Sequence, residues 1–220
     1  MVLITGIDEA GRGPIIGPLV MAGVTIEESD SDKLKEMGVK DSKLLTRDKR
    51  EELFKKILRI AKSYEIVSLT PDIIDATLLS DNMNLNILEA HTTAVILNKL
   101  GSKKALIDLP DKDASRYQNY IRDKLLDKDV ELITEHKADY NYPVVGAASI
   151  LAKVTRDRYL DFLSEQFGED FGSGYMSDPK TRVFLEKHWN NSKINFFRKE
   201  WQSWKNVRNE KTQKKLFDFD

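Results

Sequence analysis

The chain contains no cysteine among its 220 residues. This absence excludes disulfide bonds, thiolate nucleophiles and zinc sites built from cysteine. Long hydrophobic runs are also missing, because every apolar stretch is far shorter than the ~18 residues of a membrane-spanning helix. The first residues lack the basic region and the cleavage site of a signal peptide. We therefore expect a cytoplasmic protein with no membrane contact.

Histidine and excess charge are scarce as well. The three histidines, His91, His136 and His188, are scattered along the chain and do not indicate a zinc site; we interpret His136 as structural or as a support for residues of the active site. The net charge is −1, which excludes a generally basic nucleic-acid binder. Any nucleic-acid surface must then be local, with acidic residues gathered elsewhere. Hydrophobic residues make up 40% and charged residues 32%, so a folded core beneath a charged surface is expected.

The hydrophobic pattern predicts strands alternating with helices, which is typical of a layered α/β fold. The predicted strands are residues 2–8, 15–26, 65–69, 104–108 and 130–135. The predicted helices are residues 46–62, a helix that begins at Pro71, and residues 84–100, 113–126, 143–167 and 178–188. Thr46 and Asn84 are expected to cap the helices that follow them.

The composition changes after residue 188. All three tryptophans lie there, and from Arg198 to Lys215 seven basic residues face only Glu200 and Glu210. The pattern predicts a main domain over residues 1–188, a helical extension over 189–212 and a tail over 213–220. Phe197, Trp201 and Trp204 recur at helical spacing, which favours packing onto the main domain over stacking on nucleic acid.

Three acidic residues interrupt apolar segments. Asp8 and Asp108 end short strands, and Asp139 lies in a polar break before a long helix. A carboxylate at the end of a buried strand is costly unless it is paired or binds a cation, and hard oxygen ligands suit Mg²⁺ or Mn²⁺. Taken singly, each acid is more simply interpreted as a strand-end cap or as half of an ion pair. Neighbours on a strand point to opposite faces, so Asp8 and Glu9 could share a site only if the backbone turned there.

Glycines follow these first acids. The segment of residues 11–17 could be mistaken for a dinucleotide-binding loop, but a strand-like run follows it and Pro14 interrupts it. Glycines at 11 and 13 make a turn plausible, and they can also let the backbone approach a ligand closely.

Together, these segments resemble the ribonuclease HII family, closest to its archaeal branch. The matching motifs, in order, are Gly6-Ile7-Asp8-Glu9-Ala10-Gly11-Arg12-Gly13-Pro14, Val39-Lys40-Asp41-Ser42-Lys43, Ile107-Asp108, Glu135-His136-Lys137-Ala138-Asp139, Tyr142-Pro143-Val144-Val145, Ala147-Ala148-Ser149-Ile150 with Ala152-Lys153, and Gly172-Ser173-Gly174-Tyr175 with Ser177-Asp178-Pro179-Lys180-Thr181. They cover about residues 1–188. The resemblance implies a ribonuclease H-like layered fold with a mixed central sheet flanked by helices.

The resemblance also implies the residues of the active site. Asp8 would bridge two metal sites, Glu9 and Asp108 would serve one of them, and Asp139 the other. The loop Gly11-Arg12-Gly13 would recognise the ribose 2′-hydroxyl, which distinguishes RNA from DNA. Tyr175 would stack beside the sugar at the RNA–DNA junction, although by itself it is only an aromatic residue in a glycine-rich loop.

Five further residues match family positions that approach phosphates: Lys40, Ser42, Lys43, Ser149 and Lys153. Solvated surface positions are the alternative for the lysines. The chain departs from the family pattern at Leu109, where a small residue is usual, at Met176, where proline is common, and at Gly146, where serine is frequent. These departures put the fit of the substrate near Tyr175 in doubt, and not the activity.

The implied activity is endonucleolytic hydrolysis of RNA in RNA–DNA hybrids, and cutting 5′ of ribonucleotides embedded in duplex DNA. Two Mg²⁺ or Mn²⁺ ions would act in catalysis, the products would be a 3′-hydroxyl and a 5′-phosphate, and the roles would be ribonucleotide and RNA primer removal. Two alternatives remain: another two-metal nuclease on this fold, such as a Holliday-junction resolvase or a general hybrid-cutting ribonuclease H, and a non-catalytic nucleic-acid binder.

The last residues resemble a sliding-clamp-binding peptide. Such peptides carry a glutamine, an aliphatic residue three positions later and then two aromatic residues. Gln213, Leu216 and Phe219 fit this pattern, whereas Asp220 replaces the second aromatic. The hypothesis is that the tail binds a sliding clamp (PCNA), and a frayed terminus is the alternative. Otherwise, we expect a monomer.

Overall fold

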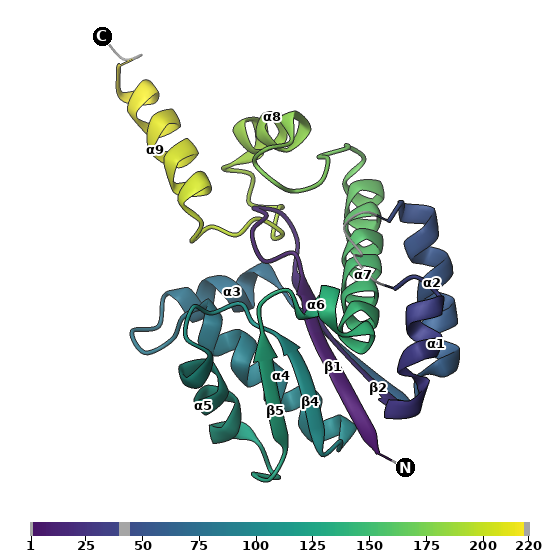
Figure 1. Cartoon of the computed structure of the whole chain (residues 1–220). Coiled ribbons are helices and arrows are strands. Elements are labelled where there is room, and N and C mark those ends of the chain that lie inside the picture. The colour runs from purple at the N-terminus through teal and green to yellow at the C-terminus, as the bar shows by residue number, and fades with distance from the viewer. Residues whose placement is uncertain (1, 40–44, 218–220) are drawn as a thin grey trace. The chain divides into compact units, whose positions relative to one another are not determined.

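The computed structural model describes residues 2–39 and 45–217, with side chains to residue 213 (Figure 1). The chain forms two compact units: unit 1 is Met1–Ala10, Val20–Ser68 and Asn84–Thr155, and unit 2 is Gly11–Leu19, Leu69–Met83 and Arg156–Asp220. This division does not follow the predicted boundary at residue 188, because two N-terminal segments group with the C-terminal part. Lys40, Ser42, Lys43 and Phe219 lie outside the described residues, and so does the side chain of Leu216.

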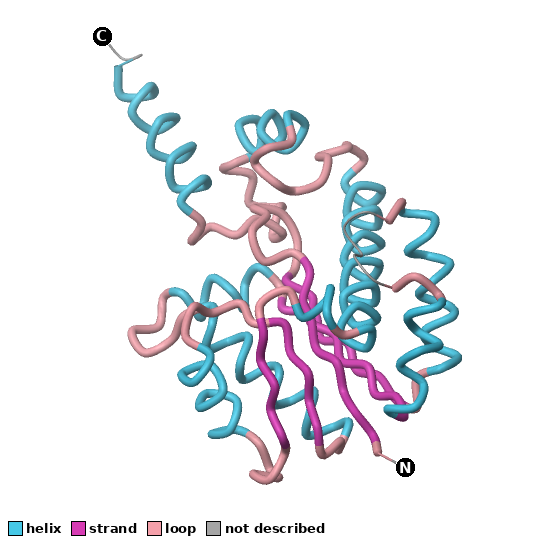
Figure 2. Tube along the Cα trace, in the orientation of Figure 1, coloured by secondary structure: helices cyan, strands magenta, loops and turns pink. Residues whose placement is uncertain are grey.

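Unit 1 is built on a five-stranded sheet (Figure 2). The strands are β1 (Leu3–Ala10), β2 (Leu19–Glu27), β3 (Ser63–Leu69), β4 (Lys104–Asp108) and β5 (Glu131–Glu135), in the order β3-β2-β1-β4-β5. The β1 strand pairs antiparallel with β2 and parallel with β4, and β4 pairs parallel with β5. The sheet is therefore mixed, which confirms the predicted α/β fold.

Helices cover both faces of this sheet. Figure 1 shows α2 (Arg47–Ile60) and the first part of α7 (Pro143–Phe167) on one side, and α4 (Leu85–Leu100) and α5 (Ala114–Lys124) on the other. Close approach requires glycine on both faces: a Cβ at Gly6 would lie 2.4 Å from the carbonyl carbon of Val144, and one at Gly23 would lie 2.4 Å from Cγ2 of Ile96. Successive residues of β1 therefore face α7 and α4 alternately.

The predicted helix starts are confirmed by their caps. Thr46 accepts a hydrogen bond from the Lys49 N–H at the start of α2, and Asn84 accepts one from the Ile87 N–H at the start of α4. Pro71 is the first residue of α3 (Pro71–Leu78), where its missing N–H costs nothing. These local signals predict element boundaries well because each cap satisfies a backbone N–H that the helix leaves unpaired.

Other elements were not predicted. A 3₁₀ turn (Glu28–Asp30), α1 (Ser31–Glu36) and α6 (Ala138–Asn141) are too short to show a helical period. The second strand begins at Leu19 and not at residue 15. Ile15 and Ile16 are fully buried in the core of unit 2, and Gly17 has a φ of 86°, which takes the backbone out of the strand conformation.

Unit 2 is held together by an aromatic core. Phe171, Phe184 and Phe197 are buried there, and the rings of Phe167 and Phe184 meet edge to face at 5.3 Å. Its other helices are α8 (Pro179–His188) and α9 (Gln202–Phe217). In the part of the chain that the structure describes, every helix is too short or too polar to cross a lipid bilayer.

The predicted helix over residues 189–212 is wrong in its first part. Residues 189–201 form turns and an isolated bridge, and the bridge pairs Phe197 with Ile16. Packing of the apolar residues is confirmed, since Phe197 belongs to the core of unit 2 and both Trp201 and Trp204 pack against it. The spacing looked helical because all three residues contact one core, although only Trp204 does so from a helix.

Candidate active site

Three of the four predicted acids lie together in unit 1. Asp8, Glu9 and Asp108 each offer a carboxylate oxygen within 4.8 Å of the others. The parallel strands β1 and β4 bring them together, since residues at the carboxyl ends of neighbouring parallel strands meet at one edge of the sheet. Three carboxylates so close repel one another, and hard oxygen ligands of this kind fit Mg²⁺ or Mn²⁺.

The expectation that Asp8 and Glu9 need a turn to share a site is wrong. Both residues lie within β1, which continues to Ala10. By the alternation of the strand, Asp8 shares the α7 face with Gly6, whereas Glu9 shares the α4 face with Ile7. The pairing of β1 with β4 ends at Ile7. Beyond Ile7, no neighbouring strand on that side of β1 lies between the side chains of Asp8 and Glu9. The carboxylates can therefore meet around the open end of β4.

Burial dominates the electrostatics of Asp8. This residue is only 4% exposed, and burial raises the pKa of its carboxyl to about 6. Lys153 opposes that rise, the charge of Asp108 adds to it, and hydrogen bonds from Ser149 and from the Glu9 N–H oppose it again. A carboxylate that resists ionisation among other acids gains more from a nearby cation than an exposed one does.

Asp139 lies on α6 of unit 1 and does not belong to the group of three. It is 6% exposed on α6, where the preceding residue Ala138 donates its N–H to Oδ1 of Asp108 at 2.8 Å. Lys137, with a φ of 60°, starts this short helix. The backbone of α6 thus fixes one oxygen of Asp108. The Nδ1 of His136 lies 3.0 Å from the carbonyl oxygen of Leu109, the residue that follows Asp108.

Ser149 and Lys153 are adjacent on α7. Lys153 Nζ donates to Oγ of Ser149, and both residues influence Asp8, as expected for i and i+4 positions on one helix face. The departure at Gly146 has a steric cause. A Cβ there would lie 2.7 Å from the carbonyl oxygen of Val39 and 3.0 Å from that of Asp139, so serine does not fit this backbone.

The glycine loop, residues 11–13, lies in unit 2 together with Tyr175. A Cβ at Gly13 would lie 3.7 Å from Cε1 of Tyr175, so the ring lies beside the loop. Gly11 has a φ of 85°, and a Cβ there would lie 2.6 Å from the Pro18 carbonyl oxygen. Tyr175 as a whole residue is 37% exposed. The structure therefore brings the predicted recognition residues of this unit together and leaves one aromatic surface accessible.

Two arginines around this loop were missed in the sequence. Arg156 is 7% exposed, donates to the Ser173 carbonyl oxygen at 2.6 Å and lies 5.2 Å from the centre of the Tyr175 ring. Arg198 is fully buried, although it begins a stretch with seven basic residues. The one available signal was its position directly after Phe196 and Phe197, since consecutive aromatic residues predict burial.

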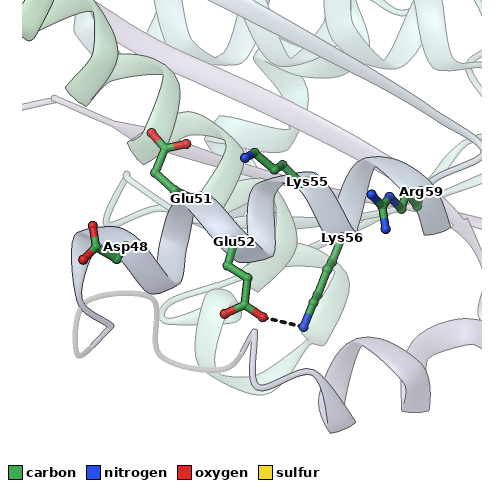
Figure 3. A pocket seen from close by; sticks show the side chains of 6 residues that line it. All are labelled: Asp48, Glu51, Glu52, Lys55, Lys56 and Arg59. Atoms are coloured by element: carbon green, nitrogen blue, oxygen red, sulfur yellow. Dashed lines mark ion pairs between the residues drawn. The ribbon is translucent and has the colours of Figure 1, made fainter.

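A hollow on α2 has a different character. Figure 3 shows that all the side chains lining it come from that single helix; they are Asp48, Glu51, Glu52, Lys55, Lys56 and Arg59. Lys49 and Lys56 both pair with Glu52 and lower the pKa of its carboxyl to about 2. These are exposed i, i+3 and i, i+4 pairs of a solvated helix face, and they provide no catalytic group.

Acidic side chains gathered at the ends of the parallel strands β1 and β4, on a mixed sheet between two helical layers, are typical of a metal-dependent nuclease of the ribonuclease H-like class. The family model described as ribonuclease HII matches residues 5–207. The chain therefore belongs to the ribonuclease HII family. It is a ribonuclease H, an endonuclease that hydrolyses phosphodiester bonds.

Known proteins of archaea agree with this assignment. Ribonuclease HII of Pyrococcus furiosus is 48% identical over 204 residues, which cover 91% of this chain and 88% of that protein. The crystal structure of ribonuclease H2 from Pyrococcus horikoshii has a TM-score of 0.86 and 39% identity, covering 95% of this chain and 98% of that one. The structure of the PCNA:RNase HII complex from Archaeoglobus fulgidus has a TM-score of 0.83 and 40% identity, covering 93% and 96%.

Proposed function

We propose that this ribonuclease cuts 5′ of ribonucleotides embedded in duplex DNA and hydrolyses the RNA strand of RNA–DNA hybrids. Two-metal-ion catalysis would leave a 3′-hydroxyl and a 5′-phosphate, and the roles in the cell would be ribonucleotide and RNA primer removal. The observation that carries the proposal is the group of Asp8, Glu9 and Asp108, whose carboxylate oxygens lie within 4.8 Å of one another. Negative charge so concentrated would repel a nucleic acid unless cations were bound to it.

The acids have distinct roles in this proposal. Asp8 would serve both of two Mg²⁺ or Mn²⁺ ions, Glu9 and Asp108 would hold one of them, and Asp139 would hold the other. When bound, such ions lower the pKa of a water molecule and stabilise the leaving oxygen of a phosphodiester. Ala138 orients Asp108 by donating its N–H to one carboxylate oxygen. The positive charge of Lys153 favours the ionised form of Asp8, which is the form that binds a cation.

Substrate recognition is assigned to a second set of residues. Gly11, Arg12 and Gly13 contact the 2′-hydroxyl through their backbone, and Tyr175 stacks on the neighbouring sugar. Support comes from the place of the Tyr175 ring beside the loop, 3.7 Å from where a Cβ on Gly13 would stand. Ser149 and Lys153 are proposed to bind phosphate; so are Lys40, Ser42 and Lys43.

The test is cleavage of a labelled DNA duplex that carries one ribonucleotide. It is run with Mg²⁺, with Mn²⁺ and with EDTA, beside an all-DNA duplex and an RNA–DNA hybrid. We expect a metal-dependent cut on the 5′ side of the ribonucleotide. Cleavage of the hybrid alone would favour a general hybrid-cutting ribonuclease H and remove the role given to the glycine loop. Binding without cleavage would leave the non-catalytic alternative.

A sliding clamp is proposed as a partner of the tail. The Archaeoglobus fulgidus relative forms a complex with PCNA, and this chain carries Gln213, Leu216 and Phe219 at the spacing of a clamp-binding peptide. Gln213 is exposed on α9. Removal of residues 213–220 should weaken binding to an archaeal sliding clamp, measured by titration calorimetry, and leave cleavage of short duplexes unchanged. Equal clamp affinity of the truncated and full chains would end this hypothesis.

A further inference from the structure

A short C-terminal segment lies along the glycine loop of unit 2. We call residues 196–201 the strap. The Gly17 N–H donates to the Phe196 carbonyl oxygen at 2.9 Å, and the Arg198 N–H donates to the Ile15 carbonyl oxygen at 2.9 Å. Between these bonds, Ile16 and Phe197 form an antiparallel bridge. The strap therefore pairs with residues 15–17, just after the loop, although about 180 positions separate the two in sequence.

The guanidinium of Arg198 donates hydrogen bonds to three backbone carbonyls. Its Nε donates to the oxygen of Gly17 at 3.0 Å, Nη1 to that of Arg12 at 2.9 Å and Nη2 to that of Gly11 at 2.5 Å. The side chain is fully buried, and its Cζ lies 4.9 Å from the centre of the Trp201 ring. A buried cation costs several kcal/mol unless its donors are satisfied, so this geometry fixes where the loop carbonyls must point.

Trp201 binds the remaining carbonyl of the loop. Its Nε1 donates to the Gly13 carbonyl oxygen at 3.2 Å. The carbonyls of three consecutive residues, Gly11, Arg12 and Gly13, therefore all point to side chains of the strap. In a trans peptide, the N–H of the next residue points opposite to the carbonyl, and the described chain contains no cis peptide bond. The N–H groups of Arg12 and Gly13 thus point away from the strap, and Pro14 has none.

We propose that Arg198 and Trp201 are positioning residues for ribonucleotide recognition. By holding the three carbonyls, they orient the peptide planes so that the Arg12 and Gly13 N–H groups are presented to the ribose 2′-hydroxyl. This inference rests on the proposed function, which assigns recognition of the 2′-hydroxyl to the glycine loop. Preorganised donors bind tightly because no order is lost when the ligand arrives.

The strap has its own anchor, which makes it a fixed support. Asp75 on α3 accepts hydrogen bonds from the backbone N–H groups of Lys199 and Glu200, at 2.8 and 3.0 Å. Loop, strap and α3 therefore form one connected network within unit 2. A loop held only by its own glycines would sample many conformations, because glycine restricts the backbone least.

The test compares two tryptophans. Trp201→Phe removes the donor to Gly13, whereas Trp204→Phe removes an Nε1–H that is buried without a hydrogen-bond partner among the described residues. Each variant is combined with Asp8→Asn, so that substrate binding is measured without cleavage. The readout is the ratio of the Kd for an all-DNA duplex to the Kd for the same duplex with one ribonucleotide.

We expect Trp201→Phe to lower this ratio about fivefold, as for one lost neutral hydrogen bond, and Trp204→Phe to leave it unchanged. In the cleaving protein, the same change should raise KM more than it lowers kcat. If Asp8→Asn alone shows no preference for the ribonucleotide, the proposed function of the loop fails. If it shows a preference that Trp201→Phe does not reduce, the role of the strap is wrong.

Arg198→Lys provides a second, stronger test. Lysine keeps the charge but cannot reach three carbonyls at fixed angles, so we expect kcat/KM for the ribonucleotide duplex to fall about 100-fold. Mn²⁺ affinity, measured by titration calorimetry, should stay unchanged, because the acids belong to unit 1. Thermal unfolding shows whether the variant is folded. A folded Arg198→Lys protein with full kcat/KM would overturn the proposal.

Discussion

The acid group of unit 1 and the glycine loop of unit 2 differ in how their charges are compensated. Asp8, Glu9 and Asp108 bring like charges together, and burial raises the pKa of Asp8 to about 6, so this group opposes folding until a cation binds. Around the loop, the buried guanidinium of Arg198 donates hydrogen bonds to the carbonyl oxygens of Gly11, Arg12 and Gly17. The first region gathers like charges, whereas in the second the buried charge is already paired with backbone oxygens.

The largest expected effect comes from Asp8→Asn. Cleavage should fall about 1000-fold or more, because a bridging ligand is lost. Stability of the metal-free protein should rise. An acid whose folded pKa is raised from 3.8 to about 6 stabilises the fold below pH 3.8 and loses that contribution as the pH rises through 6. The gain at pH 8 should be on the order of 2 kcal/mol.

Urea unfolding of both proteins in EDTA, at pH 8 and at pH 4, measures this gain. The difference between them should shrink at pH 4, where Asp8 is protonated in the folded protein. A variant that is less stable than the original protein at pH 8 contradicts the account of an acid group that opposes folding.

Gly11→Ala tests how closely the glycine loop of unit 2 is packed. The new Cβ would lie 2.6 Å from the Pro18 carbonyl oxygen and 2.7 Å from Cδ of Arg156, at a φ of 85°. We expect a loss of about 2–4 kcal/mol in the free energy of unfolding, together with lost discrimination between ribonucleotide and DNA.

Gly38→Ala is its matched control. Gly38 has a φ of 78°, but nothing lies within 4 Å of the added Cβ. Only the backbone penalty of about 1 kcal/mol should remain, and cleavage should be unchanged. Chemical unfolding and the ribonucleotide assay are measured on both variants. Equal losses from the two glycines would show that the contacts around Gly11 contribute nothing.

The smallest expected effect comes from Asp111, a buried acid whose pKa is shifted in the direction opposite to that of Asp8. Burial alone would raise the pKa of Asp111, but hydrogen bonds from Arg116, from the Asp113 N–H and from Asn86 outweigh it and hold the pKa below its usual value. An acid with a depressed folded pKa stabilises the fold above its unfolded pKa of 3.8, and this contribution is lost as the pH falls through the folded pKa.

Asp111→Asn should therefore destabilise the protein at pH 7 by about 1–2 kcal/mol, opposite in sign to Asp8→Asn. The loss should fade in strong acid. Thermal unfolding from pH 7 to pH 3 follows it, with metal-dependent cleavage at pH 7 as the control for an intact site. A loss that is the same at every pH would show that the charge of Asp111 has no part in it.

Much of the fold was predictable because its signals are local. Caps at Thr46 and Asn84 satisfy N–H groups within one turn of the chain, so the sequence around them is sufficient. The end of β4 at Asp108 and the full extent of α7 were predicted as well. The helix α6, which carries Asp139, was missed because four residues show no period.

The sequence by itself determined the acids, the glycines and the family, since these depend on residue type and order. Only the tertiary structure showed that Asp8 and Glu9 meet from opposite faces of β1, because their meeting depends on where the pairing with β4 ends. Likewise, the sequence shows Arg198 only as one of seven basic residues near the C-terminus, whereas in the fold it is fully buried. Burial and long-range pairing are properties of chain segments brought together, and so no local pattern contains them.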